Sequence, residues 1–402
     1  ELDCIIRGVT PIPGAFAYLD GKMLKINKAT PTSGKGKPGE VLALDGNGTG
    51  SILIACGEGA LKVSVVIPEG KGKMSAGDFI RGRKIAVGAG IVSVSVAAAT
   101  AASYLLTRSL VKVALDREAP KSSVKSKKKI SGSSKSGVYY EQRAAAAEKL
   151  QNSACETVEI RSRDGIKLIG HWHTCAHPKR VIIAMHGWRS SWTKDFGSIS
   201  DFWQESDCNI LYAEQRGQGA SDGAYMGFGL MERYDCLDWV EWANQNGCAE
   251  LPIYLAGVSM GASTVLMAAG QELPANVRGV MADCGFTSPH AIWQHVVERN
   301  LHIPYRGING AIANDMCKKK IQIGAKDYSC ADALRQCRVP VLFVHGTDDR
   351  FVPIEMTYEN YKACASPKRL FVVLGAAHGM SYLVDKDGYE TVVKQFWQDF
   401  DA

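Results

Sequence analysis

The stretch PIYLAGVSMGAS, residues 252–263, joins an apolar run to a segment of small residues through a serine that has glycines two places before and after it. Glycine at 257 and 261 permits a strained strand-to-helix turn, on which the hydroxyl of Ser259 projects above a sheet. The small residues after the turn let a helix approach closely, so that its N-terminal N–H groups and dipole face the same place. A G-x-S-x-G pattern alone is a weak signal, so the prediction that Ser259 is a nucleophile depends on its surroundings.

The composition indicates a folded chain with more than one domain. The 402 residues are 46% hydrophobic and 22% charged, which excludes general disorder. The net charge of +6 belongs to the front of the chain, because residues 1–84 carry 12 Lys and Arg against 8 Asp and Glu, whereas residues 146–402 carry 25 against 30. Twelve cysteines without a C-x-x-C pair favour a reducing compartment over a disulfide scaffold. A first residue other than Met indicates a fragment or a processed product.

Three compositional regimes divide the chain. Short apolar runs between glycine turns predict a small β-domain in residues 1–85. The uncharged run IAVGAGIVSVSVAAATAASYLLT (85–107) predicts an apolar helix over 86–107 that is long enough for a membrane anchor, with a buried helix or a signal-peptide core as the alternatives. Residues 108–137 are rich in Lys and Ser and predict a basic linker. The flanking charges leave the membrane side open, so the expected location is membrane-associated without a stated orientation.

Residues 138–402 alternate apolar strands with amphipathic helices. The strands are expected in the runs RVIIAMHG, NILYAEQRG, PIYLAGVS, VRGVMADCG, PVLFVHG and RLFVVLGAAHG. Such alternation is typical of an α/β fold with a mostly parallel sheet that helices cover on both faces. Reactive groups in these sheets gather just past the carboxyl ends of the strands.

Two later runs supply the groups that a serine nucleophile needs. HGTDDRFVP (345–353) offers Asp348 and Asp349, and GAAHGMSY (375–382) offers His378 as the base. The resulting order Ser, Asp, His is the one expected of the α/β-hydrolase arrangement. After the first strong strand, in MHGWRSS (185–191), the backbone N–H of Trp188 is expected to form an oxyanion hole with that of Met260.

At these residues the chain resembles the α/β-hydrolase superfamily, and more narrowly the BAAT/prolyl-oligopeptidase-like and BEM46-like bacterial serine hydrolases. The resemblance implies an α/β-hydrolase fold in which Ser259 is the nucleophile, His378 the base and Asp349 the acid, with Asp348 as the alternative acid. Glu214 departs from the family, which more often has Asp there, but that position lies outside the triad. The resemblance rests on HGWRSS, EQRGQGASDG, GVSMG, DCGFTS, HGTDDRFVP and GAAHG.

Two further segments offer alternatives. GHWHTCAH (170–177) holds His171, His173, Cys175 and His177, whose spacing suggests zinc, but a solvated strand end is the preferred interpretation, and neither a metal nor a cofactor is predicted.

About 40 residues between DCGFTS and DALRQCRVP form an insertion with helical periodicity. Its apolar positions Trp293, Val296 and Ile303 are expected to be exposed, which predicts a small lid over an apolar acyl or aryl group. The expected substrate is a small-molecule acyl ester. Amide or peptide cleavage, thioester hydrolysis and acyl transfer use the same triad and stay open.

The front of the chain resembles the C-terminal domain of methionyl-tRNA formyltransferase, on TPIPGAF and PEGKGKMSAGDFIRGR. The resemblance implies an OB-like β-barrel that contacts tRNA, while the absence of the family's catalytic domain argues against formyl transfer. A nucleic-acid-binding protein with a secondary hydrolase half is therefore the second function class, and two joined neighbouring genes would explain the combination. The candidate tRNA contacts are Arg7, Lys22, Lys25, Lys71, Lys73 and Arg81.

Overall fold

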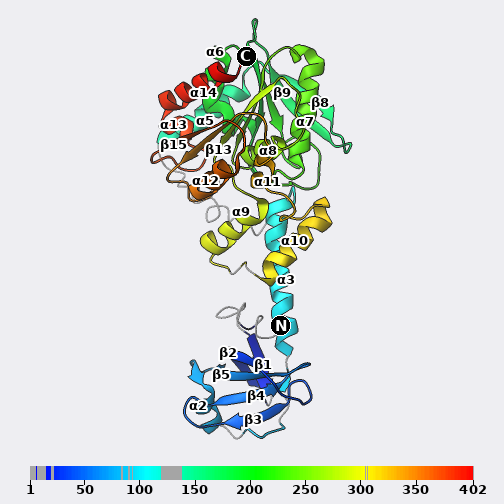
Figure 1. The fold of residues 1–402 in the computed structure, drawn as a ribbon, viewed down its shortest axis with the longest axis vertical. Coiled ribbons are helices and arrows are strands. Elements are labelled where there is room, and N and C mark those ends of the chain that lie inside the picture. Colours follow the sequence, from blue (N-terminus) through cyan, green and yellow to red (C-terminus); the bar gives the residue numbers. More distant parts are fainter. Residues whose placement is uncertain are drawn as a thin grey trace. The chain divides into compact units, whose positions relative to one another are not determined.

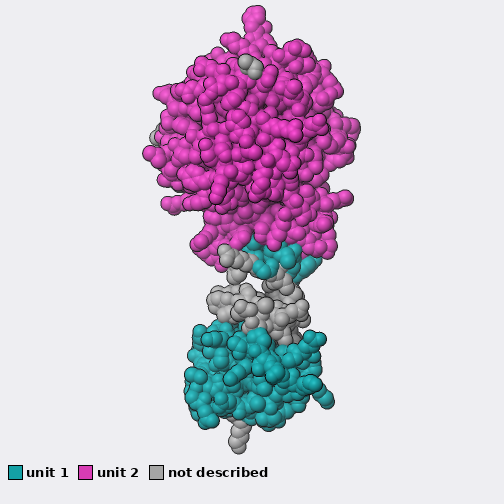
Figure 2. Space-filling model, in the orientation of Figure 1, with its two compact units in different colours: residues 1–108, 304–312 teal, residues 109–303, 313–402 magenta. Residues whose placement is uncertain are grey.

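The computed structural model describes residues 6, 15–19, 22–82, 85–88, 91–92, 94–118, 138–303, 305 and 307–401. The chain divides into two compact units (Figure 2). Unit 1 comprises Glu1–Arg108 and Pro304–Ile312, and unit 2 comprises Ser109–Ile303 and Ala313–Ala402. The predicted basic linker lies largely outside the described residues.

Unit 1 is built on antiparallel strands, as its glycine-punctuated apolar runs predict. The strands follow the order β3-β4-β5-β2-β1-β7, and β6 pairs with β5. Alternate positions such as Val41, Ile52 and Val63 fill the core under the short helix α2, whose Phe79 is buried. Closure into an OB-type barrel stays a prediction. The elements are β1 (Ala15–Leu19), β2 (Lys22–Thr32), β3 (Val41–Asp45), β4 (Ser51–Ala55), β5 (Ala60–Pro68), β6 (Met74–Ser75), α2 (Ala76–Arg81) and β7 (Ile91–Val92).

The apolar run predicted as a membrane anchor takes a different form. Its start contributes to β7, and the helix α3 (Val94–Leu115) begins and ends eight residues later than the predicted 86–107. The last turns of α3 therefore include Arg108 and Lys112. Among the described residues, no helix has the length and apolar character needed to cross a membrane, so the anchor is without support.

Unit 2 contains an eight-stranded sheet in the order β15-β14-β13-β12-β10-β11-β9-β8. The six strands from β15 to β11 pair in parallel, and β9 and β8 complete one edge in antiparallel pairing. This arrangement confirms the predicted α/β-hydrolase sheet. The strands are β8 (Glu156–Arg161), β9 (Lys167–His173), β10 (Arg180–Met185), β11 (Cys208–Glu214), β12 (Ile253–Val258), β13 (Val277–Asp283), β14 (Val341–Gly346) and β15 (Lys368–Val373).

Helices cover both faces of this sheet (Figure 1). On one face, aromatic side chains of α6 and α14 such as Phe196 and Phe396 pack with Leu150 of α5 on Ile182 and Tyr254 of the sheet. On the other face, α8 packs against β12 and β13 and in turn carries α7 and α11. The helices are α5 (Val138–Gln151), α6 (Trp192–Glu205), α7 (Glu232–Ala243), η2 (Asn244–Cys248), α8 (Met260–Ala268), α9 (Pro289–His295), η3 (Val296–Asn300), α10 (Ile308–Ile321), α11 (Cys330–Leu334), α12 (Ile354–Ala363), α13 (Ser381–Val384) and α14 (Lys386–Phe400).

Candidate active site

Ser259 occupies the turn between β12 and α8 with φ 57° and ψ −118°, a backbone conformation that L-residues rarely adopt. The turn is tight enough that a Cβ at Gly257 would lie 2.2 Å from the carbonyl oxygen of Gly261, and a Cβ at Gly261 would lie 1.7 Å from that of Met185. The Ser259 N–H donates to the carbonyl of Asp283 at 2.9 Å, which ties the turn to β13. The two glycines are therefore required by space, as the motif predicts.

His378, in the loop after β15, lies between the serine and a carboxylate. Its Nε2 is 2.8 Å from Ser259 Oγ, and its Nδ1 is 2.6 Å from Asp349 Oδ2. Because a carboxylate only accepts, Nδ1 carries the proton and Nε2 accepts from the hydroxyl. Burial opposes a charge on the ring, but the negative charge of Asp349 and its hydrogen bond outweigh burial and raise the pKa of His378. The ring is thus oriented and polarised to accept a proton.

Asp349 is held on both oxygens. Its Oδ1 accepts the N–H groups of Phe351 and Val352, each at 2.9 Å. Its Oδ2 faces His378 and lies 3.3 Å from Nε2 of His345. Burial alone would raise the pKa of this carboxyl, but the two histidines hold it well below its usual range, so Asp349 stays ionised.

The neighbouring aspartate, the alternative acid, lies elsewhere. Asp348 is exposed, and its Oδ1 accepts a long 3.3 Å hydrogen bond from Thr347. Its backbone N–H donates to the carbonyl of Ala376, which turns the loop so that the next residue, Asp349, points inward. The geometry therefore brings Asp349, not Asp348, to His378.

In the loop after β10, the backbone N–H groups on either side of Trp188 are engaged. The N–H of Gly187 donates to Asp195 at 2.7 Å, that of Arg189 to Gln218 at 2.5 Å and that of Ser190 to the Gly187 carbonyl at 3.3 Å. Within the described part of the chain, the N–H of Trp188 has no acceptor. The N–H of Met260, in the first turn of α8, also has none there, since helix starts leave such donors unpaired. These are the two N–H groups that the sequence predicts for an oxyanion hole.

Sequence reasoning missed the residues that support these groups. Asp195 of α6 binds the loop through Gly187 and through Ser190 Oγ at 2.7 Å, and Arg143 of α5 pairs with it at 2.6 Å. His345 is fully buried and contacts Thr357 at 2.7 Å and the Val352 carbonyl at 2.9 Å. The only sequence signal for His345 was its place four residues before Asp349, and Asp195 gave none.

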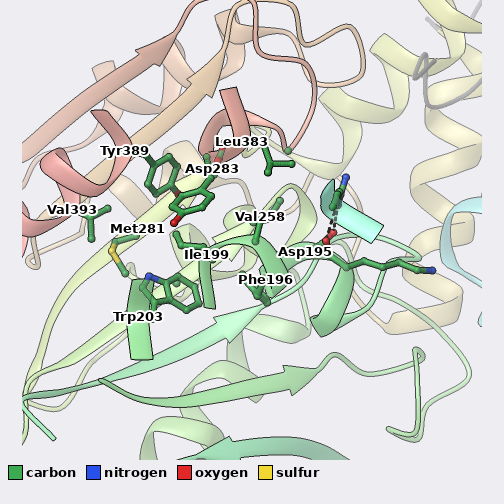
Figure 3. A pocket seen from close by; sticks show the side chains of 17 residues that line it. Asp195, Phe196, Ile199, Trp203, Val258, Met281, Asp283, Leu383, Tyr389 and Val393 are labelled. Carbon is green, nitrogen blue, oxygen red and sulfur yellow. Dashed lines mark hydrogen bonds and ion pairs between the residues drawn. The ribbon is translucent and has the colours of Figure 1, made fainter. Parts of the chain in front are cut away.

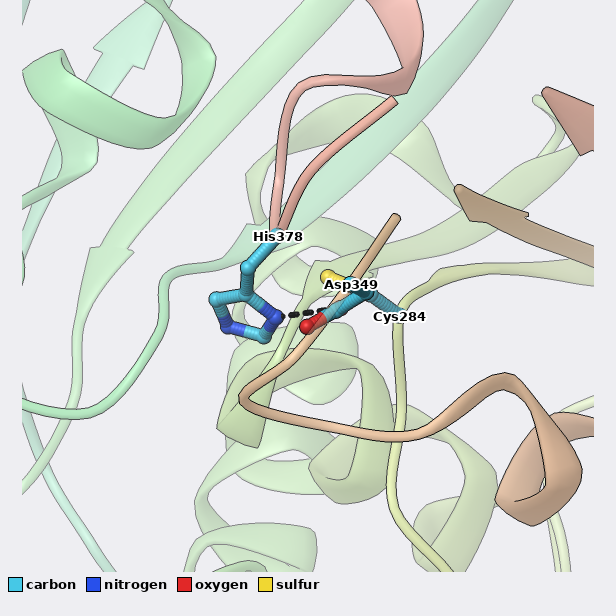
Figure 4. Close-up of side chains that lie close together, drawn as sticks. All are labelled: Cys284, Asp349 and His378. Atoms are coloured by element: carbon cyan, nitrogen blue, oxygen red, sulfur yellow. Dashed lines mark hydrogen bonds and ion pairs between the residues drawn. The ribbon is translucent and has the colours of Figure 1, made fainter. Parts of the chain in front are cut away.

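One group of described side chains has metal-ligand spacing. The ligand atoms of Cys284, Asp349 and His378 lie within 4.8 Å of one another (Figure 4). Burial raises the pKa of the Cys284 thiol well above its ordinary value, and a protonated thiol is a poor ligand. The other two residues already hydrogen-bond to each other. This arrangement fits proton transfer better than metal binding.

The histidine-rich stretch, residues 170–177, begins within β9, near one edge of the sheet. His171 of β9 contacts Glu214 at 2.8 Å and stacks on Trp192 at 4.2 Å between ring centroids. Nothing in the described chain gathers His171, His173, Cys175 and His177 into a metal-binding group. Glu214, where the family more often has Asp, thus has a structural partner in this chain.

The inserted segment after β13 contributes α9 and η3. Trp293 was expected to be exposed, but it is only 7% exposed because it packs edge-on against Phe228 at 5.4 Å. Val296 and Ile303 are half-buried. Phe228 also contacts Trp188 and Phe286, so aromatic rings lie beside the oxyanion loop. The lid remains a prediction. The aromatic rings beside the loop support the expectation that the site is apolar.

A separate pocket lies on the face of the sheet that α6 covers (Figure 3). Trp203, Ile199 and Met281 form part of its apolar wall, and the carboxyl group of Asp283 adjoins it. The carboxyl of Asp283 accepts from Ser381 Oγ at 3.0 Å, and burial raises its pKa to about 6. Val258 and Gly379, the chain neighbours of Ser259 and His378, also line this pocket.

The candidate tRNA contacts in unit 1 differ in their environment. Lys22, Lys71 and Lys73 are exposed and Lys25 is half-buried. The guanidinium of Arg81 is already engaged within unit 1, because it donates to the carbonyls of residues 46 and 48 and to Asp78. Arg7 lies outside the described residues.

Unit 2 has the α/β-hydrolase fold. Residues 176–302 match the family described as Serine aminopeptidase, S33, and residues 1–84 match the formyl transferase, C-terminal domain family. The esterase Pf2001 of Pyrococcus furiosus superposes with a TM-score of 0.53 and 20% identity, covering 63% of this chain and 94% of that one. Likeness at this identity shows the fold alone.

Curated relatives match the two parts separately. Methionyl-tRNA formyltransferase of Myxococcus xanthus is 48% identical over 88 residues, which are 22% of this chain and 27% of that protein. The uncharacterized protein YqkD of Bacillus subtilis is 28% identical over 191 residues, 47% of this chain and 61% of that one. The chain spans about a quarter of the formyltransferase and less than two thirds of the YqkD protein.

Proposed function

We propose that the chain is a serine hydrolase that cleaves small-molecule carboxylic esters through an acyl-enzyme intermediate. The observation that carries the proposal is the continuous hydrogen-bonded series from Ser259 Oγ through His378 to Asp349, with distances of 2.8 and 2.6 Å. A serine hydroxyl is a weak nucleophile by itself and needs such a base, which in turn needs an orienting acid.

In the proposed reaction, Ser259 Oγ attacks the ester carbonyl carbon while Nε2 of His378 takes the hydroxyl proton. The negative oxygen of the tetrahedral intermediate accepts from the N–H groups of Trp188 and Met260. Collapse of the intermediate breaks the bond to the alkoxy oxygen, which leaves as an alcohol with the proton from His378. Water then repeats the sequence on the acyl-enzyme and releases the carboxylic acid. Asp349 stays ionised throughout and stabilises the imidazolium.

The test uses the full chain and a fluorophosphonate probe, which reacts only with activated serines. We expect labelling of the wild type, loss of labelling in Ser259→Ala and retained labelling in Ser263→Ala, which removes a hydroxyl one helical turn further on. Hydrolysis of p-nitrophenyl esters of increasing chain length, beside matched anilides and thioesters, then separates esterase from amidase and thioesterase activity. A folded wild type that does not label refutes the proposal.

A second function is proposed for residues 1–85, on their match to the formyl transferase C-terminal domain: contact with tRNA. Binding through exposed lysines such as Lys71 and Lys73 weakens steeply with salt, because phosphate contacts release counterions. We expect Lys71→Gln with Lys73→Gln to weaken tRNA binding and to reduce the slope of binding against salt. If the double variant binds tRNA as tightly as the wild type at every salt concentration, this role is refuted. Detection of the intact 402-residue chain in bacterial cells by mass spectrometry tests whether the two parts act as one protein. Membrane association, expected from the apolar run at 85–107, is a separate proposal, and recovery of the chain in membrane fractions tests it.

A further inference from the structure

The C-terminal end of α3 is built into unit 2. The last four carbonyls of a helix have no partner within the helix and need one from elsewhere. Here the Lys112 carbonyl accepts from the N–H of Asp116, and the Leu115 carbonyl accepts from the N–H of Met226 at 2.7 Å. The other two carbonyls, those of Val113 and Ala114, accept hydrogen bonds from side chains of the loop after β10.

Trp188 and Arg189 of that loop cap the helix with their side chains. The indole N–H of Trp188 donates to the Ala114 carbonyl at 2.9 Å. The guanidinium of Arg189 donates to the Val113 carbonyl at 2.9 and 3.2 Å and to the Arg117 carbonyl at 3.0 Å, and it also bonds to the carbonyl of Asp116. A cation at a helix C-terminus is favoured by the helix dipole as well as by these bonds.

Further contacts fix the end of α3 against the body of unit 2. The side chains of Val111 and Leu115 are 3% and 0% exposed. Arg117 donates from its backbone to Ala224 and from its guanidinium to the carbonyls of residues 219 and 221, and Asp116 pairs with Lys320 at 2.6 Å. Residues 109–117, called the strap from here on, therefore offer a fixed surface to the loop.

The loop that the strap holds is a strained one. Arg189 has φ 51°, a left-handed conformation that costs free energy in a non-glycine residue. Such a conformation persists only when surrounding contacts determine it, and for Arg189 those contacts are Gln218 on its backbone and the strap carbonyls on its side chain. The residue immediately before it is Trp188, whose N–H is one of the two proposed oxyanion donors.

We propose that the strap positions the oxyanion loop for catalysis, and that Arg189 is the positioning residue that transmits this. The inference rests on the proposed hydrolase function and adds to it a dependence on a helix that precedes the residues aligned with the hydrolase family. Displacement of the strap lets the backbone of Arg189 relax and moves the Trp188 N–H away from the tetrahedral oxygen. Turnover falls as a result, while the triad stays intact.

The experiment compares Arg189→Met and Arg189→Lys with Arg180→Met in the full chain. Arg180 is the control, because it is the first residue of β10, the strand that leads into this loop, and its guanidinium likewise donates to a backbone carbonyl, that of Ser206, besides pairing with Asp401. We expect both Arg189 variants to lose about 10–100-fold in kcat, the scale of a misplaced catalytic donor, with KM changed less than about threefold. Lysine rescues only in part, because it lacks the planar fork.

A second pair of variants tests the strap from its own side. Leu115→Ala loosens the strap and is expected to lower kcat in the same way, whereas Leu168→Ala, at an equally buried leucine of β9, is not. The pH at which kcat/KM is half-maximal stays unchanged in the three strap and loop variants, since neither Arg189 nor Leu115 contacts His378 or Asp349.

The outcomes are distinct. Wild-type kcat in Arg189→Met and Leu115→Ala overturns the inference, and so does an equal loss of kcat in Arg180→Met and Leu168→Ala, which would show general destabilisation. A wild type that neither labels nor hydrolyses esters instead overturns the proposed function, and the inference with it.

Discussion

Replacing Asp349 with asparagine is the sharpest test of the proposed mechanism, because the structure fixes how the amide must sit. Oδ1 accepts two backbone N–H groups, from Phe351 and Val352, so the amide oxygen takes that position. The NH₂ group is then forced to face Nδ1 of His378, 2.6 Å away in the native chain. A donor in that place selects the tautomer with its proton on Nε2, which cannot accept the proton of Ser259.

The expected loss in kcat is about 10³–10⁴-fold, which corresponds to about 4–5.5 kcal/mol of transition-state stabilisation. The assay is steady-state hydrolysis of a p-nitrophenyl ester at pH 8, with guanidinium chloride unfolding to establish that the variant is folded. Asp348→Asn is the matched control, since Asp348 is exposed and faces away from the histidine. Activity of Asp349→Asn within tenfold of wild type, or an equal loss in Asp348→Asn, would refute the assignment of the acid.

Three other predictions concern the base, the serine turn and a buried ion pair. The pKa of His378 is raised above its ordinary 6.5, so the neutral base persists only at higher pH, and a pH profile of kcat/KM is expected to show its acid limb above pH 6.5; a limb below that value contradicts the geometry. Gly261→Ala places a Cβ 1.7 Å from a backbone oxygen of β10 and is expected to destabilise by at least about 1–3 kcal/mol in chemical denaturation, whereas Gly72→Ala, with open space around it, is not. Arg216→Met leaves the 1% exposed Asp235 carboxylate without its 2.5 Å partner and is expected to cost about 3–5 kcal/mol of unfolding free energy; a change below about 1 kcal/mol would contradict this.

The sequence predicted much of the hydrolase part because its signals are local. Each of the six parallel strands lies in an apolar run, so burial on both faces of a parallel sheet could be inferred without any tertiary contact. The glycines around Ser259 and the chain order Ser, Asp, His predicted the position of the candidate site for the same reason, since both are properties of short segments at strand ends.

Other expectations failed where a distant segment decided the outcome. The apolar run at 85–107 predicted a helix of that extent, but β7 takes its start and the helix continues to Leu115. Trp293 looked exposed in its helical pattern, yet Phe228 covers it. A local pattern gives the periodicity of a segment and says nothing of which partner it meets.

By itself, then, the sequence predicted the parallel sheet, the strained serine turn and the serine and histidine of the proposed triad, because backbone sterics and apolar periodicity act over a few residues. The resemblance implied Asp349, and the tertiary structure brings Asp349 rather than Asp348 to His378, since the loop after β14 hydrogen-bonds to the loop after β15. Only the tertiary structure brought the end of α3 to Arg189, 72–76 residues away along the chain. Contacts of that separation form because the sheet sets where its loops lie, and no short stretch of sequence carries that information.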